Sequence, residues 1–235
     1  MRVSFSENLE EFEHFLGYHF HDKRLLLESL THKSYHHENP DEVISYNERL
    51  EFLGDSVLGL VIAETLFTEN NPLTEADMSK MKSYLVNKSI LFETATMLTI
   101  GKYLKLGKGE ESTGGRHKNS ILADAMEALV GAIFLDSDYA TVKTVIQRLF
   151  NQRIANVIAK KEGYDFKSEL QERCQGVFGV LPEYKIVKQE GEEHKKVFTI
   201  EVYINGELYG IGLGKSKKEA QMIAAEKAFA KLMNG

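Results

Sequence analysis

Hydrophobic side chains recur at helical spacing through the first two thirds of the chain. Leu9, Phe12 and Leu16 lie three or four residues apart, which places them on one face of a helix. No part of this region keeps the period-two alternation that is typical of a half-buried strand. The pattern predicts an all-α domain over residues 1–160, with helices over about 45–68, 77–86, 88–99, 119–134 and 138–160 and a polar, glycine-rich loop over 107–118.

The pattern changes after residue 160. A short polar linker over 161–164 precedes a helix over about 165–175, three strands over 184–188, 197–204 and 208–213, and a last helix over 217–233. Asn205-Gly206, between the second and third strands, is a strong signal for a tight hairpin turn. We therefore expect a second, small α+β domain over 165–235, with the order α-β-β-β-α.

The composition is that of a folded chain. Its 235 residues are 43% hydrophobic and 27% charged, which excludes a largely disordered protein. A single cysteine, Cys174, excludes a scaffold held by disulfides within the chain. The sequence shows neither a signal peptide nor an apolar stretch of about 18 residues. We therefore expect a reducing, cytoplasmic setting and no membrane partner.

Charge is distributed unevenly between the two regions. The net charge is −6, and residues 1–164 hold the whole excess, with 18 basic and 24 acidic side chains. Residues 165–235 are balanced, with 11 of each kind. This distribution argues against binding of nucleic acid through bulk positive charge, but it allows local basic clusters and acidic groups that hold cations.

Carboxylates interrupt an otherwise apolar segment between Asn47 and Leu60. Glu48, Glu51 and Asp55 fall within an arc of about 60° on a helix that turns about 100° per residue. Such spacing is usual for a solvated helix face. Here most neighbours are apolar, and like charges on a largely buried helix repel each other unless a cation or a shared proton compensates.

A second apolar segment, over 120–134, repeats this arrangement. Its only charged residues are Asp124 and Glu127, three residues apart and so on one helix face. One interpretation is that Arg or Lys from elsewhere pairs with them. The other is that the two helices converge and that Glu51 and Asp55 join them as oxygen ligands. Four such ligands suit Mg²⁺ or Mn²⁺, which serve phosphoryl chemistry.

The segment from Asn47 to Ser56 resembles the signature of the ribonuclease III family, and 120–127 resembles the second acidic motif of that family. The resemblance extends over nearly the whole chain, including 31–35 and 107–115. It implies that the metal ligands are Glu51, Asp55, Asp124 and Glu127, that Mg²⁺ is the cofactor and that Mn²⁺ can substitute. It further implies that hydrolysis depends most on Asp55 and Glu127.

Three more residues take a role from this resemblance. Glu48 matches a further acidic position of the signature, and Glu75 matches an acidic residue that borders the catalytic cleft in relatives. Both are candidate catalytic residues. Phe52 matches an aromatic position that packs into the partner subunit of a homodimer, although an ordinary core residue is the alternative.

The last 70 residues contain a lysine cluster. Lys215, Lys217 and Lys218 lie where the third strand meets the last helix, and a helix start with lysines suits phosphate oxygens. A solvated helix start is the alternative. Gln171 and Glu172 on the first helix, and the loop containing His194, resemble the other contact regions of a double-stranded RNA-binding domain over 165–233.

Together these residues predict a magnesium-dependent endoribonuclease that acts on double-stranded RNA as a homodimer. By resemblance it leaves 5′-phosphate and 3′-hydroxyl ends with short 3′ overhangs, and its substrates are ribosomal RNA precursors and some mRNA and tRNA precursors. The alternative is a catalytically inactive regulatory protein that binds double-stranded RNA. The presence of all four carboxylates favours the enzyme.

Overall fold

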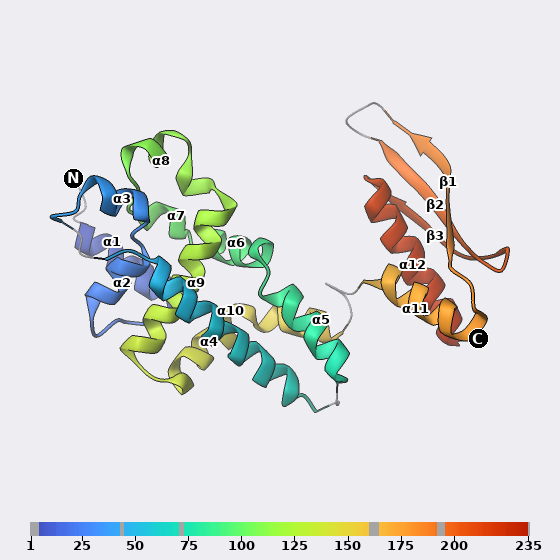
Figure 1. Ribbon diagram of the computed structural model, residues 1–235, viewed down its shortest axis with the longest axis horizontal. Helices are drawn as coiled ribbons and strands as arrows, with labels where there is room; N and C mark the ends of the chain where they lie inside the picture. The colour runs from blue at the N-terminus through green and yellow to red at the C-terminus, as the bar shows by residue number, and fades with distance from the viewer. Residues whose placement is uncertain (1–4, 43–44, 71–72, 160–164, 192–195, 235) are drawn as a thin grey trace. The chain divides into compact units, whose positions relative to one another are not determined.

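The computed structural model describes residues 5–42, 45–70, 73–159, 165–191 and 196–234 (Figure 1). The chain divides into two compact units, Met1–Gly163 and Tyr164–Gly235. Among the described residues, no helix is long and apolar enough to cross a membrane.

The first unit is entirely helical apart from one isolated bridge between Thr31 and Lys105, within the residues described. Its elements are α1 (Phe5–Leu16), α2 (Lys23–Ser29), α3 (Lys33–Glu38), α4 (Glu48–Phe67), α5 (Glu75–Leu85), α6 (Lys88–Met97), α7 (Ile100–Tyr103), α8 (Lys108–Ser112), the 3₁₀ helix η1 (Gly115–His117), α9 (Asn119–Asp136) and α10 (Tyr139–Ile158). The predicted all-α first domain is confirmed.

Several predictions of local structure in this unit differ from the observed elements. Helix α5 begins at Glu75 and not at 77, because the Thr74 side chain caps it by accepting a hydrogen bond from the Asp77 backbone N–H. Helix α6 ends at Met97, two residues before Thr99, whose φ of 53° is left-handed. The predicted loop over 107–118 contains the short helices α8 and η1.

Helix α9 forms the centre of the first unit. Eleven of its residues are buried, among them Met126, Leu129 and Ile133, and α4 and α6 pack along it (Figure 1). Helices α4 and α9 approach closely at two glycines. A Cβ atom on Gly54 would collide with the carbonyl oxygen of Glu127, and one on Gly131 would lie 3.1 Å from the Gly54 nitrogen. This contact fixes how the acidic faces of the two helices meet.

The second unit has the predicted order α-β-β-β-α. Its elements are α11 (Phe166–Phe178), β1 (Glu183–Glu190), β2 (Val197–Ile204), β3 (Glu207–Gly214) and α12 (Lys217–Asn234). The sheet is antiparallel with the order β1-β2-β3. Asn205 and Gly206 both have positive φ, 50° and 81°, as the hairpin between Ile204 and Glu207 requires.

Both helices of this unit cover one face of the sheet (Figure 1). Leu170 and Cys174 of α11 pack with Ile200 and Val202 of β2 in a single buried cluster. Helix α12 can lie against β3 because alanines face glycines there. A Cβ on Gly212 would collide with the carbonyl oxygen of Ala220.

Candidate metal and RNA-binding sites

Three carboxylates meet where α4 and α9 cross. Glu51 comes from α4, and Asp124 and Glu127 come from α9. One oxygen of each lies within 4.8 Å of the others, and all three side chains are half buried. Glu51 lies one turn before Gly54 and Glu127 one turn before Gly131, so the close helix crossing brings these carboxylates together.

Asp55 lies beside this group but is not part of it. It is one turn beyond Glu51 on α4, and it is exposed. Its negative charge nevertheless contributes to raising the pKa of Glu127. The structure therefore brings three of the four predicted ligands together and places the fourth within electrostatic range, on the solvent side.

The electrostatics of the group are unfavourable without a cation. Burial, together with the charges of Asp55, Glu51 and Asp124, raises the pKa of Glu127 to about 7. Burial and the charge of Asp124 also raise the pKa of Glu51. Among the residues described, no side chain forms a hydrogen bond or ion pair with the carboxylate of Glu51 or Glu127. The group is therefore short of positive charge.

The donor set fits a hard divalent ion. All three groups are carboxylates on well-packed helices, and neither histidine nor cysteine joins them in the described part of the chain, so the set matches Mg²⁺ or Mn²⁺ better than zinc. The alternative interpretation, that Lys or Arg pairs with these carboxylates, accounts for only one of the three. This is Asp124, whose Oδ1 lies 3.2 Å from Lys88 Nζ.

Glu48 and Glu75 do not join the group. Glu48, the first residue of α4, is exposed, and its Oε1 lies 3.0 Å from Lys33 Nζ. Glu75, the first residue of α5, is also exposed and accepts a hydrogen bond of 2.8 Å from Ser79 Oγ. Glu75 lines a hollow of about 390 Å³ beside the C-terminal half of α4, away from Glu51.

Phe52 is not a core residue, so that alternative was wrong. Its side chain is 79% exposed on α4. It borders a hollow of about 620 Å³ that is also lined by Leu25, Leu53 and the exposed Leu135. Further exposed apolar residues on α4 are Leu60 and Phe67, which the sequence analysis missed because helical periodicity does not show whether an apolar side chain is covered.

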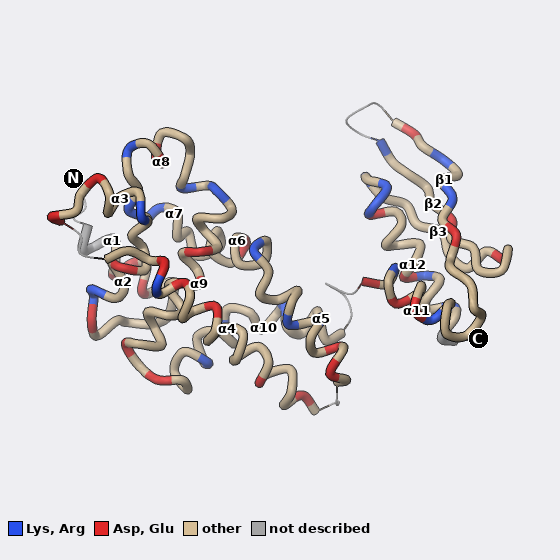
Figure 2. The backbone as a smooth tube through the Cα atoms, viewed as in Figure 1, with Lys and Arg blue, Asp and Glu red and all other residues tan. Residues whose placement is uncertain are grey.

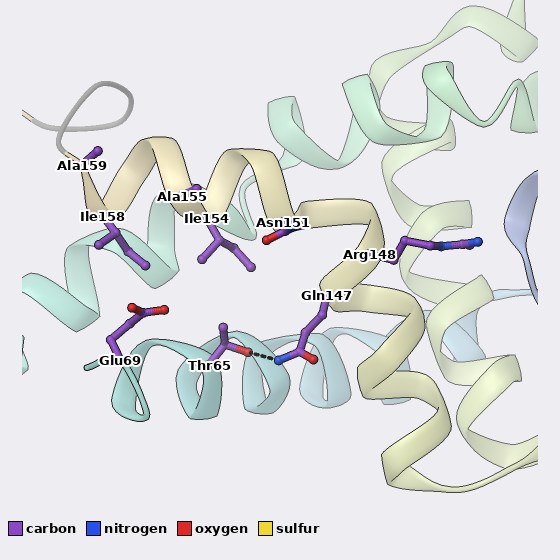
Figure 3. A pocket seen from close by; sticks show the side chains of 9 residues that line it. All are labelled: Thr65, Glu69, Gln147, Arg148, Asn151, Ile154, Ala155, Ile158 and Ala159. Carbon is purple, nitrogen blue, oxygen red and sulfur yellow. Dashed lines mark hydrogen bonds between the residues drawn. The ribbon is translucent and has the colours of Figure 1, made fainter. Parts of the chain in front are cut away.

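A hollow of about 690 Å³ lies between the C-terminal half of α4 and α10 (Figure 3). Gln147 Nε2 donates a hydrogen bond of 3.2 Å to Thr65 Oγ1 across it, and Arg148 extends away from the other lining residues. None of the predicted site residues lines this hollow.

The predicted RNA-contacting residues of the second unit lie on its surface. Lys215, Lys217 and Lys218 are all exposed at the β3–α12 junction, where Figure 2 shows basic residues at the start of α12. The Lys215 backbone N–H donates a 2.6 Å hydrogen bond to Glu219, which holds this junction. Gln171 and Glu172 are exposed on α11. His194 lies outside the described residues.

Comparisons with known proteins agree with this geometry. Residues 22–154 match the family model "Ribonuclease-III-like", and residues 166–232 match "Double-stranded RNA binding motif". Ribonuclease 3 of Natranaerobius thermophilus is 47% identical over 225 residues, 96% of each chain. Ribonuclease 3 of Syntrophotalea carbinolica is 41% identical over 213 residues, 91% of this chain and 92% of that protein.

A solved structure agrees as well. The nuclease domain of ribonuclease III from Campylobacter jejuni, described with a region involved in dimer formation, is 42% identical and superposes with a TM-score of 0.57. The match covers 62% of this chain and 97% of that one. A helical domain with a carboxylate group, followed by an RNA-binding module, defines a class of double-strand-directed endoribonucleases. This chain belongs to the ribonuclease III family.

Proposed function

We propose that this protein hydrolyses phosphodiester bonds of double-stranded RNA with Mg²⁺ at the carboxylate group. The observation that carries this proposal is the convergence of Glu51, Asp124 and Glu127 within 4.8 Å in a chain of the ribonuclease III family. The alternative, an inactive RNA-binding protein, gives no reason for three half-buried carboxylates to converge, two of which, Glu51 and Glu127, have a raised pKa.

The carboxylates of α4 and α9 would hold the ion. Glu51, Asp124 and Glu127 offer it oxygen ligands from two packed helices, and Asp55 completes the set from the solvent side. When bound, Mg²⁺ or Mn²⁺ supplies a Lewis acid that neutralises charge on the scissile phosphate and makes water a stronger nucleophile. Asp55 and Glu127 are the pair whose loss affects hydrolysis most. In-line attack leaves a 5′-phosphate and a 3′-hydroxyl.

The exposed apolar face of α4 supports the proposal of a homodimer. Phe52, Leu60 and Phe67 lie within about 80° of arc on this helix, and each is more than half exposed. Phe52 would pack into the partner subunit beside the hollow that Leu135 lines. A symmetric dimer has two sites, and one cut in each strand gives short 3′ overhangs. Glu48 and Glu75 would border the cleft.

The second domain, over 165–235, would hold duplex RNA, and the linker over 161–164 would join it to the catalytic and dimerisation domain over 1–160. Lysines 215, 217 and 218 are exposed and suit phosphates, while Gln171, Glu172 and His194 would contact minor grooves. The substrates proposed are ribosomal RNA precursors and some mRNA and tRNA precursors in the cytoplasm.

The test is cleavage of a long, perfect RNA duplex with and without Mg²⁺. The wild type should give short duplexes only when Mg²⁺ is present. Glu127→Gln should bind RNA and cut nothing, whereas Glu93→Gln, which changes an exposed carboxylate on α6, should cut normally. If the wild type is folded and binds RNA but cuts nothing in Mg²⁺ or Mn²⁺, the inactive RNA-binding protein becomes the better hypothesis.

A further inference from the structure

Lys88 is the one lysine in contact with the carboxylate group, among the residues that the structure describes. Its Nζ lies 3.2 Å from Oδ1 of Asp124. Asp124 lies 36 positions further along the chain, so no short motif connects the two residues. The pair is therefore a product of the tertiary structure.

The backbone of Lys88 is held firmly, whereas its side chain is mostly exposed. Lys88 is the first residue of α6, and the Asn87 side chain caps this helix by accepting a 2.9 Å hydrogen bond from the Ile90 N–H. Ile90 and Leu91 are buried where α6 packs along α9. The Lys88 side chain itself is 71% exposed, so its ammonium group can leave Asp124 without disturbing the core.

The charge of Lys88 acts on the whole group. Its hydrogen bond and the charge of Asp124 raise its own pKa, with contributions from Glu127 and Glu51. In return its positive charge opposes the rise in pKa at Glu127 and Glu51. Lys88 is thus an internal cation that partly compensates the carboxylates and contacts one of the residues that would bind a divalent ion, Asp124.

Lysine is suited to alternate between two anions. Its ammonium group is a compact charge with three donors on a flexible four-carbon stem, and it binds phosphate as readily as carboxylate. The Lys88 side chain is exposed beside Asp124, so a phosphodiester at the carboxylate group would be within its reach. Lys33, the other nearby lysine, is instead held by Glu48 at 3.0 Å, outside the group.

We propose that Lys88 is a substrate-positioning residue that pairs with Asp124 when the carboxylates hold no divalent ion and with an RNA phosphate oxygen when they do. This proposal rests on the proposed function, because it needs a divalent ion at Asp124. It predicts two opposite effects of removing the lysine: tighter binding of the ion and weaker binding of RNA.

The first experiment measures metal binding without RNA. Mg²⁺ and Mn²⁺ are titrated by calorimetry into the wild type, Lys88→Met, Glu127→Gln and Lys102→Met. Lys102→Met is the matched control because Lys102 forms a comparable exposed ion pair, 2.9 Å from Glu11. Lys88→Met should bind the ions about three- to tenfold more tightly, since one competing charge is gone. Lys102→Met should match the wild type, and Glu127→Gln should lose binding.

The second experiment measures RNA affinity in Ca²⁺, which takes the same oxygen ligands. Lys88→Met should bind duplex RNA several-fold more weakly. The negative slope of log affinity against log salt should become less steep by about 1, the value for one lost phosphate contact. Lys88→Arg should keep both the affinity and the slope. A purely structural lysine would not change the slope.

The outcomes separate the two proposals. A wild type that takes up neither Mg²⁺ nor Mn²⁺ overturns the proposed function and the role of Lys88 together. If the wild type binds the ions but folded Lys88→Met has the same ion affinity or the same salt slope as the wild type, only the role of Lys88 is overturned. Circular dichroism of each variant establishes that it is folded.

Discussion

Gly54 of α4 and Gly131 of α9 face each other where the two helices cross, and neither has room for a Cβ atom. A Cβ on Gly131 would lie 3.1 Å from the Gly54 nitrogen and would collide with the Leu50 carbonyl oxygen. Because Glu51 and Glu127 each lie one turn before one of these glycines, the crossing sets the distance between the carboxylates.

Gly54→Ala should therefore weaken both the fold and the metal site. The added methyl group meets the backbone of Glu127, which has no rotamer by which to move away. We expect a loss of about 1–3 kcal/mol in the free energy of unfolding, and weaker Mn²⁺ binding because α4 shifts away from α9. Urea unfolding and calorimetry measure the two effects.

Gly59→Ala, on the same helix, is the control. A Cβ on Gly59 would have Lys82 Cε as its nearest neighbour, at 3.8 Å, so nothing needs to move. Alanine should raise the stability by up to about 1 kcal/mol through its helix propensity. Equal stability and equal Mn²⁺ affinity of the two variants would show that the close crossing does not control the site.

Asp136 should account for part of the acid sensitivity of the first domain. It ends α9, and its side chain is 2% exposed. Its Oδ2 accepts hydrogen bonds from Tyr18 Oη (2.7 Å) and the His21 N–H (2.8 Å), and its Oδ1 accepts one from the Asp22 N–H (2.7 Å). Burial alone would raise its pKa, but these hydrogen bonds together lower it.

A lowered pKa in the folded state means that this stability is present above the pKa of an unfolded aspartate and is lost as pH falls through the folded pKa. Asp136→Asn should cost about 2 kcal/mol at pH 7, because the amide turns a donor toward one of the three hydrogen-bond donors. The difference from the wild type should shrink in acid. Chemical unfolding from pH 7 down to pH 3 measures it.

Asp138→Asn is the control for this pH profile. Asp138 caps α10 by accepting a 2.8 Å hydrogen bond from the Thr141 N–H, and asparagine caps a helix about as well as aspartate. Asp138→Asn should therefore change the stability by only a few tenths of a kcal/mol. An Asp136→Asn profile that runs parallel to the wild type at all pH values would contradict the assigned role of Asp136.

Phe52→Asp should shift the protein toward monomers. Phe52 is 79% exposed, and burying a side chain of this size in a partner is worth about 2–3 kcal/mol, so the dissociation constant should rise at least tenfold. Met97→Asp is the matched control, since Met97 is 75% exposed on α6. Sedimentation equilibrium compares the two. The same association constant for both variants would speak against Phe52 as a dimer contact.

Replacing Lys215, Lys217 and Lys218 together by Met should weaken binding of duplex RNA regardless of its sequence. If each lysine neutralises one phosphate, the salt slope should fall by about 3. The charge-matched control replaces Lys185, Lys188 and Lys227, which are exposed elsewhere in the second unit. Filter binding over a range of salt concentrations measures the slopes. Equal slopes for the two triple variants would show that the lysine cluster does not contact the RNA.

Much of the fold could be predicted because it depends on local physics. The helical periodicity of the first domain, the alternation of Phe198, Ile200, Val202 and Ile204, and the Asn205-Gly206 turn all act within a few residues. Boundaries such as the start of α5 were missed because a single cap, that of Thr74, decides them.

The candidate site was predicted only in part. Helical spacing alone placed Glu51 and Asp55 on one face and Asp124 with Glu127 on another. It gave no reason for Glu48 to turn toward Lys33, or for Phe52, among apolar neighbours, to be exposed. The orientation of Glu48 depends on Lys33, which is distant in the sequence. The exposure of Phe52 depends on which other elements pack against α4.

The sequence by itself determined which residue types stand on which face of each helix and strand, because those positions follow from the geometry of one element. Only the tertiary structure decided which faces meet. It brought Glu51 to Asp124 and Glu127 through a helix crossing that two glycines permit, and it placed Lys88 against Asp124. Contacts of this kind join segments tens of residues apart, and their geometry depends on how the whole core packs.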